Sequence, residues 1–219
     1  MRNIILIAPP AAGKGTQAEL LEHNYNIPHI STGDLLRNAI EKNDYLSKEI
    51  KTSIDNGLFV RDEIVLNLVI NRIKMDDCYN GYILDGFPRN LNQAELYTNF
   101  LETNNKDLGI VILIDLDKEI AKSRINNRIS CLNCGRVYNL NDKKLQPINA
   151  GICDDCGYNL IKRKDDNNET YEIRYNEYVK DTEPIINYYR DKGILYLVDG
   201  NTEVEKIHSQ ILNIIKNIK

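Results

Sequence analysis

The chain lacks the features that mark membrane proteins, secreted proteins and nucleic-acid binders. Its 219 residues include no tryptophan and only three phenylalanines. Together with heavy use of Asn, Lys, Ile and Tyr, this points to a base bias of the genome and carries no functional information. No apolar run approaches the roughly 20 residues that cross a bilayer. The formal net charge of −4 gives no reason to expect nucleic acid or a membrane surface as a partner.

A secretory signal is also missing. Residues 1–7 carry one positive charge and an apolar run too short for a signal peptide, with no small-residue cleavage site after it. We therefore expect a cytoplasmic chain. In that compartment, the five cysteines favour metal ligands or buried thiols over disulfides. Cys78 stands apart from the other four and is expected to be a small buried or half-buried thiol.

Short apolar runs alternate with helix-like stretches along the chain, without internal repeats or low-complexity linkers. A continuous aliphatic run is typical of a strand buried on both faces. The alternation predicts an α/β fold in which helices cover both faces of a parallel sheet. Strands are expected at residues 3–7, 28–30, 81–84, 109–116 and 194–198, and helices at 63–75, 91–103, 118–128 and 171–190. Residues 131–164 break the pattern and predict a small inserted subdomain, and residues 31–60 form a second, mostly helical excursion.

The stretch "LIAPPAAGKGTQ", residues 6–17, has the order of a phosphate-binding loop. A strand is followed by a loop ending in Gly13, then by Lys14 and a helix, and such loops place backbone N–H groups and a lysine around phosphates. The hydroxyl comes one position late, at Thr16. Ala8 and Ala11 replace the usual glycines, and an alanine forced to positive φ costs about 1 kcal/mol. We therefore expect a weakened or adjusted cradle that still binds phosphate.

Two further motifs carry charge that suits phosphate chemistry. In "GYILDGFPRN", residues 81–90, Asp85 ends an apolar run, where an acidic residue in a phosphate-loop protein holds Mg²⁺ or its waters. In "STGDLLR", residues 31–37, Ser31 or Thr32 can cap a helix. Arg37 and Arg89 could together neutralise a monophosphate, although a capped surface helix and a surface arginine are the plainer interpretations.

More arginines follow in the second half of the chain. Arg124 and Arg128 are four residues apart on one expected helix, which would place them on one face. Arg163 and Arg174 flank the acidic turn "KDDNNE". Arginines in such positions are commonly solvated or paired with neighbouring acids. Phosphoryl transfer, in contrast, needs positive charge placed around the equatorial phosphate oxygens.

Four cysteines form two Cys-x-x-Cys pairs, Cys131 with Cys134 and Cys153 with Cys156, separated by the 18 residues of 135–152. A glycine follows each pair and would allow a tight knuckle. This spacing is typical of a structural zinc site with four thiolates. We assign such a site to stability, because a closed shell of four cysteines leaves no position for catalysis.

Together these motifs resemble one known family. "GKGTQ", "ISTGDLLR", "LDGFPR", "GRVY", "RKDD" and "LVDG" occur in the order and spacing of adenylate kinases, over essentially the whole chain. The resemblance implies a P-loop kinase core with a five-stranded parallel sheet flanked by helices, a helical AMP-binding subdomain and a small zinc-bearing lid of the long bacterial type. It assigns residues 1–30, 61–126 and 167–219 to the core, 31–60 to the AMP-binding subdomain and 127–166 to the lid.

The resemblance also implies site residues. Lys14 would bind the β- and γ-phosphates of ATP, and Asp85 would hold the water shell of Mg²⁺. The cradle would be completed by Gly13, Gly15 and Thr16, and the AMP pocket would be formed by Thr32, Arg37, Val60, Gly86, Arg89 and Gln93. Thr32 and Gln93 would touch the adenine. The residues that close over the transferring group would be Arg124, Arg128, Arg163 and Arg174, with Tyr138 of the lid near ATP, and the structural Zn²⁺ ligands would be Cys131, Cys134, Cys153 and Cys156.

The expected activity is therefore reversible, Mg²⁺-dependent transfer from ATP to AMP giving two ADP, by a cytoplasmic monomer that binds neither nucleic acid nor membrane. The same chemistry with GTP as donor, or with UMP or CMP as acceptor, is a close alternative. A nucleotide-binding protein with an impaired loop is another. A zinc-ribbon nucleic-acid binder is disfavoured, because residues 131–157 hold only three basic side chains, which three acidic ones balance.

Overall fold

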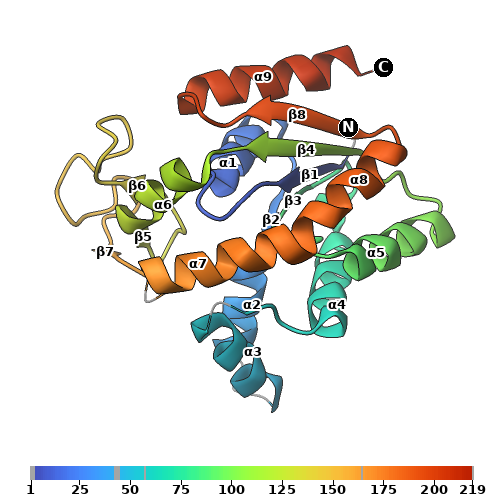
Figure 1. Ribbon diagram of the computed structural model, residues 1–219, viewed down its shortest axis with the longest axis horizontal. Coiled ribbons are helices and arrows are strands. Elements are labelled where there is room, and N and C mark those ends of the chain that lie inside the picture. The colour runs from blue at the N-terminus through green and yellow to red at the C-terminus, as the bar shows by residue number, and fades with distance from the viewer. Residues whose placement is uncertain (1–2, 42–44, 57, 164, 219) are drawn as a thin grey trace.

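The computed structural model describes residues 3–41, 45–56, 58–163 and 165–218. Its centre is a five-stranded sheet in the order β2-β3-β1-β4-β8 (Figure 1), and all four strand pairings are parallel. The strands are β1 (Ile4–Ile7), β2 (His29–Ser31), β3 (Ile83–Asp85), β4 (Ile110–Asp115) and β8 (Leu195–Asp199). Each expected strand is present, so the parallel α/β sheet predicted from the aliphatic runs is confirmed.

Helices cover both faces of this sheet. They are α1 (Lys14–Tyr25), α4 (Asp62–Ile73), α5 (Leu91–Thr103), α6 (Lys118–Asn126), α7 (Asn168–Glu177), α8 (Glu183–Asp191) and α9 (Val204–Asn217), with a 3₁₀ turn at Asp76–Cys78. The side chains of β1 alternate between the two layers. Ile4 and Leu6 pack into a cluster that includes α1 and α9 residues, whereas Ile5 and Ile7 join one that includes α4, α5 and α8 residues. This alternation follows from the two-residue period of a strand.

The helix expected at residues 171–190 is interrupted. Helix α7 passes through a π-helical turn, Tyr178–Thr182, before α8 begins, and Figure 1 shows the two helices as one long rod across the sheet. Such turns insert a residue into a helix and re-aim the side chains around them. Here the Thr182 hydroxyl donates to the carbonyl oxygen of Arg89 at 2.7 Å. The π-helical turn is therefore hydrogen-bonded to the loop after β3.

Two excursions leave the core at the carboxyl end of the sheet. Helices α2 (Thr32–Glu41) and α3 (Tyr45–Asp55) lie within residues 31–60, and a second sheet in the order β6-β5-β7 lies within residues 127–166. Its antiparallel strands are β5 (Arg128–Cys131), β6 (Val137–Asn139) and β7 (Leu160–Ile161). Figure 1 places these excursions on separate sides of the N-terminal end of α7. The division into core, AMP-binding and lid segments stays a prediction.

The expected helix at residues 118–128 is too long. Helix α6 ends at Asn126, and Arg128 is the first residue of β5. The inference that Arg124 and Arg128 share a helix face is therefore wrong. The β5 pairing with β6 draws Arg128 into the small sheet, where it lies opposite Asn139. In the part of the chain that the structure describes, no helix has the length and apolar character needed to cross a membrane.

Candidate active site

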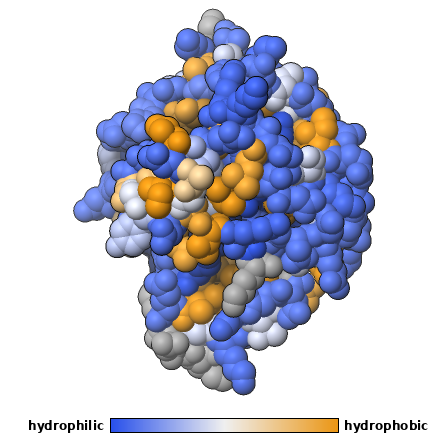
Figure 2. Space-filling model, turned by 90° about the vertical axis from the view of Figure 1, so that its left-hand side faces the viewer, coloured by the Kyte–Doolittle hydropathy of each residue, from blue (hydrophilic) through white to orange (hydrophobic). Residues whose placement is uncertain are grey.

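The residues predicted to form the nucleotide site line one cleft. It has a volume of about 500 Å³ and is lined by every residue predicted to contact nucleotide, phosphate or Mg²⁺. The four cysteines do not line it. Residues from the loop after β1, the β3 end, α2, α6, the small sheet and α7 thus face one space. Figure 2 shows the side of the molecule that carries the small sheet, where apolar patches interrupt a mostly hydrophilic surface.

The loop after β1 has the shape of a phosphate cradle around an inward-turned lysine. Gly13 adopts a left-handed conformation, φ +85°, directly before α1. The Nζ of Lys14 donates to the carbonyl oxygens of Ala8 at 2.8 Å and Pro9 at 3.4 Å. Burial lowers the pKa of Lys14 to about 8, and the charge of Asp85 opposes that shift. Lys14 therefore lies inside the loop that it is predicted to share with phosphate.

The two unusual alanines of the loop differ in backbone conformation. Ala11 has φ +63°, so the strain expected of alanine at a glycine position does apply there. Ala8 does not adopt positive φ; its methyl group is buried with the apolar cluster that contains Ile4 and Leu6. The cost foreseen for an alanine at positive φ therefore falls on one of the two positions.

Asp85 ends β3 and lies beside a histidine that sequence reasoning missed. The Nε2 atom of His29, on the neighbouring strand β2, is 3.4 Å from Asp85 Oδ2. Burial by itself raises the pKa of Asp85, but His29 and the charge of Lys14 outweigh it and hold that pKa below its ordinary value. Burial would lower the pKa of His29, but Asp85 raises it. Asp85 is therefore an ionised carboxylate at the floor of the cleft. The signal for His29 was its place just before "IST" on an expected strand.

Beyond Asp85, the chain forms a second subsite with α2. The Thr32 hydroxyl donates to the carbonyl oxygen of Gly86 at 2.9 Å, and Arg89 Nε donates to the same oxygen at 2.9 Å. Gly86 has φ +81°, and a Cβ there would lie 2.7 Å from the Thr32 hydroxyl oxygen, so only glycine fits. The Arg89 guanidinium lies over the ring of Phe59, 5.3 Å from its centroid. Burial, with the nearby charge of Arg174, lowers the pKa of Arg89 to about 10.

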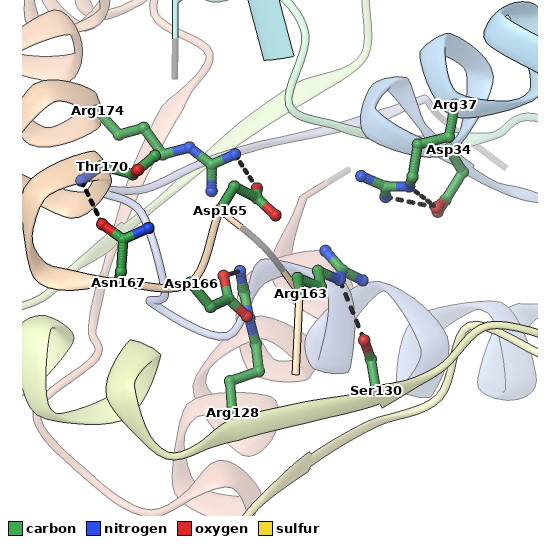
Figure 3. Close-up of polar contacts among 10 residues, drawn as sticks. All are labelled: Asp34, Arg37, Arg128, Ser130, Arg163, Asp165, Asp166, Asn167, Thr170 and Arg174. Atoms are coloured by element: carbon green, nitrogen blue, oxygen red, sulfur yellow. Dashed lines mark hydrogen bonds and ion pairs between the residues drawn. The ribbon is translucent and has the colours of Figure 1, made fainter. Parts of the chain in front are cut away.

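Arginine side chains from three segments turn toward one space, as Figure 3 shows for Arg37, Arg163 and Arg174. Each has a partner. Arg37 Nη2 lies 2.6 Å from Asp34 Oδ1, Arg163 Nε donates to the Ser130 hydroxyl at 3.1 Å, and Arg174 is bonded to Asp165. Arg128 forms a two-pronged pair with the buried Asp166. Burial and the charge of Arg128 lower the pKa of Arg163 to about 10.

At Arg37, Arg128 and Arg174, carboxylates thus occupy positions that phosphate oxygens could take. Asp34 and Asp165 both have pKa values below the ordinary one, because arginine charge outweighs the opposing effect of burial. The sequence shows an acidic stretch at 164–169 but gives its aspartates no evident role. Their proximity to Arg128 and Arg174 depends on the return of the chain from β7 into α7, which local sequence patterns do not reveal.

The four paired cysteines meet in the small sheet. Their sulfur atoms all lie within 4.8 Å of one another, with Cys131 and Cys156 at 3.4 Å and Cys134 and Cys153 at 3.5 Å. A tetrahedral ion with metal–sulfur bonds of about 2.3 Å places its ligands about 3.8 Å apart. The glycine knuckles have the expected positive φ at Gly135 and at Gly157. These thiols can therefore hold a metal ion.

Tyr138 belongs to this sheet, in β6, and Arg124 lies in α6 shortly before it. The Tyr138 ring is buried, and its hydroxyl faces Cys153 Sγ at 3.5 Å while accepting from the Asp154 N–H at 2.7 Å. Tyr138 therefore contacts the cysteine cluster as well as lining the cleft. Arg124 Nη2 lies 3.4 Å from the carbonyl oxygen of Gly200. Cys78, as expected, is a buried thiol away from the cluster.

Comparison with known proteins agrees with this geometry. The sequence model of the family "Adenylate kinase" matches residues 6–194. An adenylate kinase of Kosmotoga olearia is 44% identical over 216 residues, covering 99% of this chain and 100% of the relative. One from Archaeoglobus fulgidus is 45% identical over 217 residues, and one from Clostridium perfringens strain SM101 is 43% identical over 216, each with 99% of both chains covered. The chain therefore belongs to the adenylate kinase family.

Proposed function

We propose that this chain transfers a phosphoryl group reversibly from Mg²⁺-bound ATP to AMP, giving two ADP, and so balances adenine nucleotides. One observation carries the proposal. One cleft is lined by the loop that carries Lys14, by Thr32 and Gln93, and by arginines from several segments. Two nucleotides that enter from opposite ends would meet with their phosphates among those arginines.

On the ATP side, the loop residues would bind the phosphates. Lys14 exchanges its two carbonyl acceptors, Ala8 and Pro9, for β- and γ-phosphate oxygens. Gly13, Gly15 and Thr16 supply the N–H groups at the start of α1. Tyr138 of the lid would border the nucleoside of ATP, and Arg124, which also lines the cleft, would close over the transferring group.

On the AMP side, Arg37 and Arg89 would neutralise the monophosphate, while Thr32, Val60 and Gln93 surround the base. Gly86 supplies a backbone without a side chain between base and phosphate. The burial of Arg89 favours this task, because a guanidinium that has already lost its water gains more from an anion than a solvated one. The AMP oxygen then attacks the γ-phosphorus directly, and no side chain acts as a covalent nucleophile.

Phosphoryl transfer requires that the protein position the reactants and place positive charge around the transferring group. Arg128, Arg163 and Arg174 would move from their partners Asp166, Ser130 and Asp165 toward the equatorial oxygens of the transferring group, where charge is stabilised in the transition state. Until then, Asp166 holds Arg128, Asp165 holds Arg174, and Ser130 holds Arg163.

Asp85 fits the magnesium that phosphoryl transfer requires. It is an ionised carboxylate near Lys14, and carboxylates with retained waters are the usual surroundings of Mg²⁺. When bound, magnesium would screen the negative charge of the phosphate groups. Asp85 would hold the water shell of the ion, and Thr16 would lie near it.

Zinc is the metal that best suits the four thiols, because tetrahedral thiolate sites are its preferred structural environment. It would stabilise the lid. The lid also contacts the core at an exposed ion pair, where Lys144 Nζ lies 3.0 Å from Glu203 and 3.3 Å from Glu205. Closure of the lid would exclude water, which otherwise hydrolyses ATP. The cytoplasmic location and monomeric state stay predictions.

The deciding experiment measures ADP formation from ATP and Mg²⁺ with AMP, UMP or CMP as acceptor, and with GTP replacing ATP. Turnover with AMP and ATP well above the other combinations is expected. Equal use of UMP or CMP would assign the chain a broader acceptor range. ATP binding without turnover on any acceptor would mean that the loop with its two alanines is impaired and the protein is a binder.

A further inference from the structure

The Asp62 carboxylate accepts hydrogen bonds from three side-chain amides at the edge of the proposed AMP pocket. Asp62 is the first residue of α4, and its Oδ1 accepts from Asn90 Nδ2 at 2.8 Å and from Gln93 Nε2 at 2.7 Å. Its Oδ2 accepts from Asn92 Nδ2 at 2.7 Å. The N-terminal end of α4 is thereby bonded to the start of α5. Nothing in the motif analysis singled out Asp62.

The other end of the Gln93 amide is also engaged. Its Oε1 accepts from the backbone N–H of Arg89 at 2.8 Å. The side chain is buried, with 1% of its surface exposed. Its backbone N–H is bonded to Asn90 Oδ1 at 2.8 Å, so the residue as a whole is held at the helix start.

These partners permit one orientation of the amide. An ionised carboxylate only accepts hydrogen bonds, and a backbone N–H only donates. Turning the amide by 180° would place Gln93 Oε1 against the Asp62 carboxylate and Nε2 against the Arg89 N–H. Both hydrogen bonds would be lost, and four partly or fully buried polar groups would face like partners, which is costly inside a protein.

Among the residues that the structure describes, the Gln93 amide has one N–H and one lone pair without a partner. These are left for a ligand, and Gln93 lines the cleft. A 6-aminopurine presents an amino donor beside the N1 acceptor, which matches a carbonyl and an N–H in the fixed orientation. A 6-oxopurine presents an acceptor beside an N1–H donor, which matches only the turned amide. A site built for one hydrogen-bonding pattern rejects the reverse pattern strongly.

We propose that Asp62 is a specificity-determining positioning residue, which holds the Gln93 amide in the orientation that accepts 6-aminopurine and rejects 6-oxopurine monophosphates. The inference rests on the proposed function, since it requires that Gln93 contacts the acceptor base. Asp62 itself does not line the cleft. It acts through Gln93 by fixing which atom points at the base.

The test compares AMP with inosine monophosphate as acceptor, using the wild type and Asp62→Asn. An asparagine at this position can donate as well as accept, so the turned amide gains a partner. We expect the ratio of kcat/KM for AMP to kcat/KM for inosine monophosphate to fall by about tenfold or more, with the KM for ATP unchanged. A ratio between two acceptors separates specificity from general loosening, which lowers both values together.

Two control variants complete the design. Asn92→Ala removes one hydrogen bond from the same carboxylate without touching Gln93, and Glu63→Gln removes the neighbouring charge on α4. Both should keep the wild-type ratio. An unchanged ratio in folded Asp62→Asn would overturn the inference while leaving AMP turnover intact.

The wild type alone provides a second check that needs no variant. Strong preference for AMP over inosine monophosphate is expected. Equal use of the two would show that the Gln93 amide turns freely, which overturns the inference but not phosphoryl transfer. A wild type that phosphorylates neither acceptor would overturn the proposed function, and the inference with it.

Discussion

The Nζ atom of Lys14 lies 2.8 Å from the carbonyl oxygen of Ala8, six residues earlier in the same loop. The contact closes the loop on its own lysine, which is buried and has a pKa lowered to about 8 by that burial. A buried ammonium group needs partners, and the carbonyl groups of Ala8 and Pro9 provide them. Phosphate oxygens would be stronger partners, so the arrangement favours ligand binding at this point.

Replacement of Lys14 should therefore separate activity from folding. We expect Lys14→Met to lower kcat/KM by at least about a hundredfold, because a positioned charge at the transferring group is lost. The melting temperature should not fall, since methionine keeps the buried stem and removes a charge that burial disfavours. Steady-state kinetics and thermal melting measure both. Lys206→Met, on the exposed side of α9, is the control, and comparable activity in the two variants would contradict the assignment.

The two loop alanines should respond oppositely to glycine. Ala11→Gly relieves the strain of φ +63° and should raise the free energy of unfolding by up to about 1 kcal/mol. Ala8→Gly removes a buried methyl group from a non-strained position and should lower it by about 1–2 kcal/mol. Denaturant unfolding of both variants gives the comparison. Equal changes in the two would mean that backbone strain at Ala11 is unimportant.

Metal removal should act on the lid before it acts on chemistry. We expect a strong chelator to lower the melting temperature, because the four thiols lose the ion that joins two knuckles. Calorimetry with metal analysis checks this. Cys134→Ser should lose the metal, whereas Cys78→Ser, whose sulfur lies outside the cluster, should keep it. A melting temperature that does not change although metal has left would refute a structural role.

His208 should make stability depend on pH. Its Nδ1 lies 3.1 Å from Gln17 Oε1 and its Nε2 lies 2.8 Å from Asn24 Nδ2, so the ring accepts from Asn24 and must be neutral there. Burial lowers the pKa of His208 below 6.5. As pH falls, the unfolded chain therefore takes up a proton at this histidine before the folded chain does. The contribution of neutral His208 to the free energy of unfolding is present above pH 6.5 and is lost as pH falls through the folded pKa.

A variant of His208 is needed to isolate its effect on stability, because His29 changes stability in the opposite direction. Asp85 raises the pKa of His29, so the contribution of His29 to the free energy of unfolding is present below pH 6.5 and is lost as pH rises through the folded pKa. The melting temperature of His208→Gln, which cannot titrate at position 208, should therefore approach or pass that of the wild type as pH is lowered from 8 to 5. A constant difference across this range would rule out titration of His208.

Much of the site could be predicted from the sequence because its motifs are local. Gly13 and Lys14 are adjacent, Asp85 ends an aliphatic run, and each cysteine pair spans four residues. Parallel strands bring such loop residues to one edge of the sheet. The limit of local patterns is visible at Arg128, whose helical spacing from Arg124 was misleading, because pairing with β6 decides its conformation.

Residues that act through a partner elsewhere in the chain were missed. His29 is beside Asp85, and Asp62 is bonded to Gln93 across 31 positions. The sequence signal of each is weak, because a histidine on a short strand and an aspartate at a helix start are common. Their roles come from the neighbour that folding supplies.

The sequence by itself determined the parallel α/β core, the phosphate loop and the two cysteine pairs, because each depends on residue type and spacing over a few turns or strands. Only the tertiary structure decided which acid faces which arginine, that Ala11 and not Ala8 is strained, and which way the Gln93 amide points. The physical reason is that hydrogen bonds and ion pairs between distant segments depend on ångström-scale placement, which the packing of the whole chain sets.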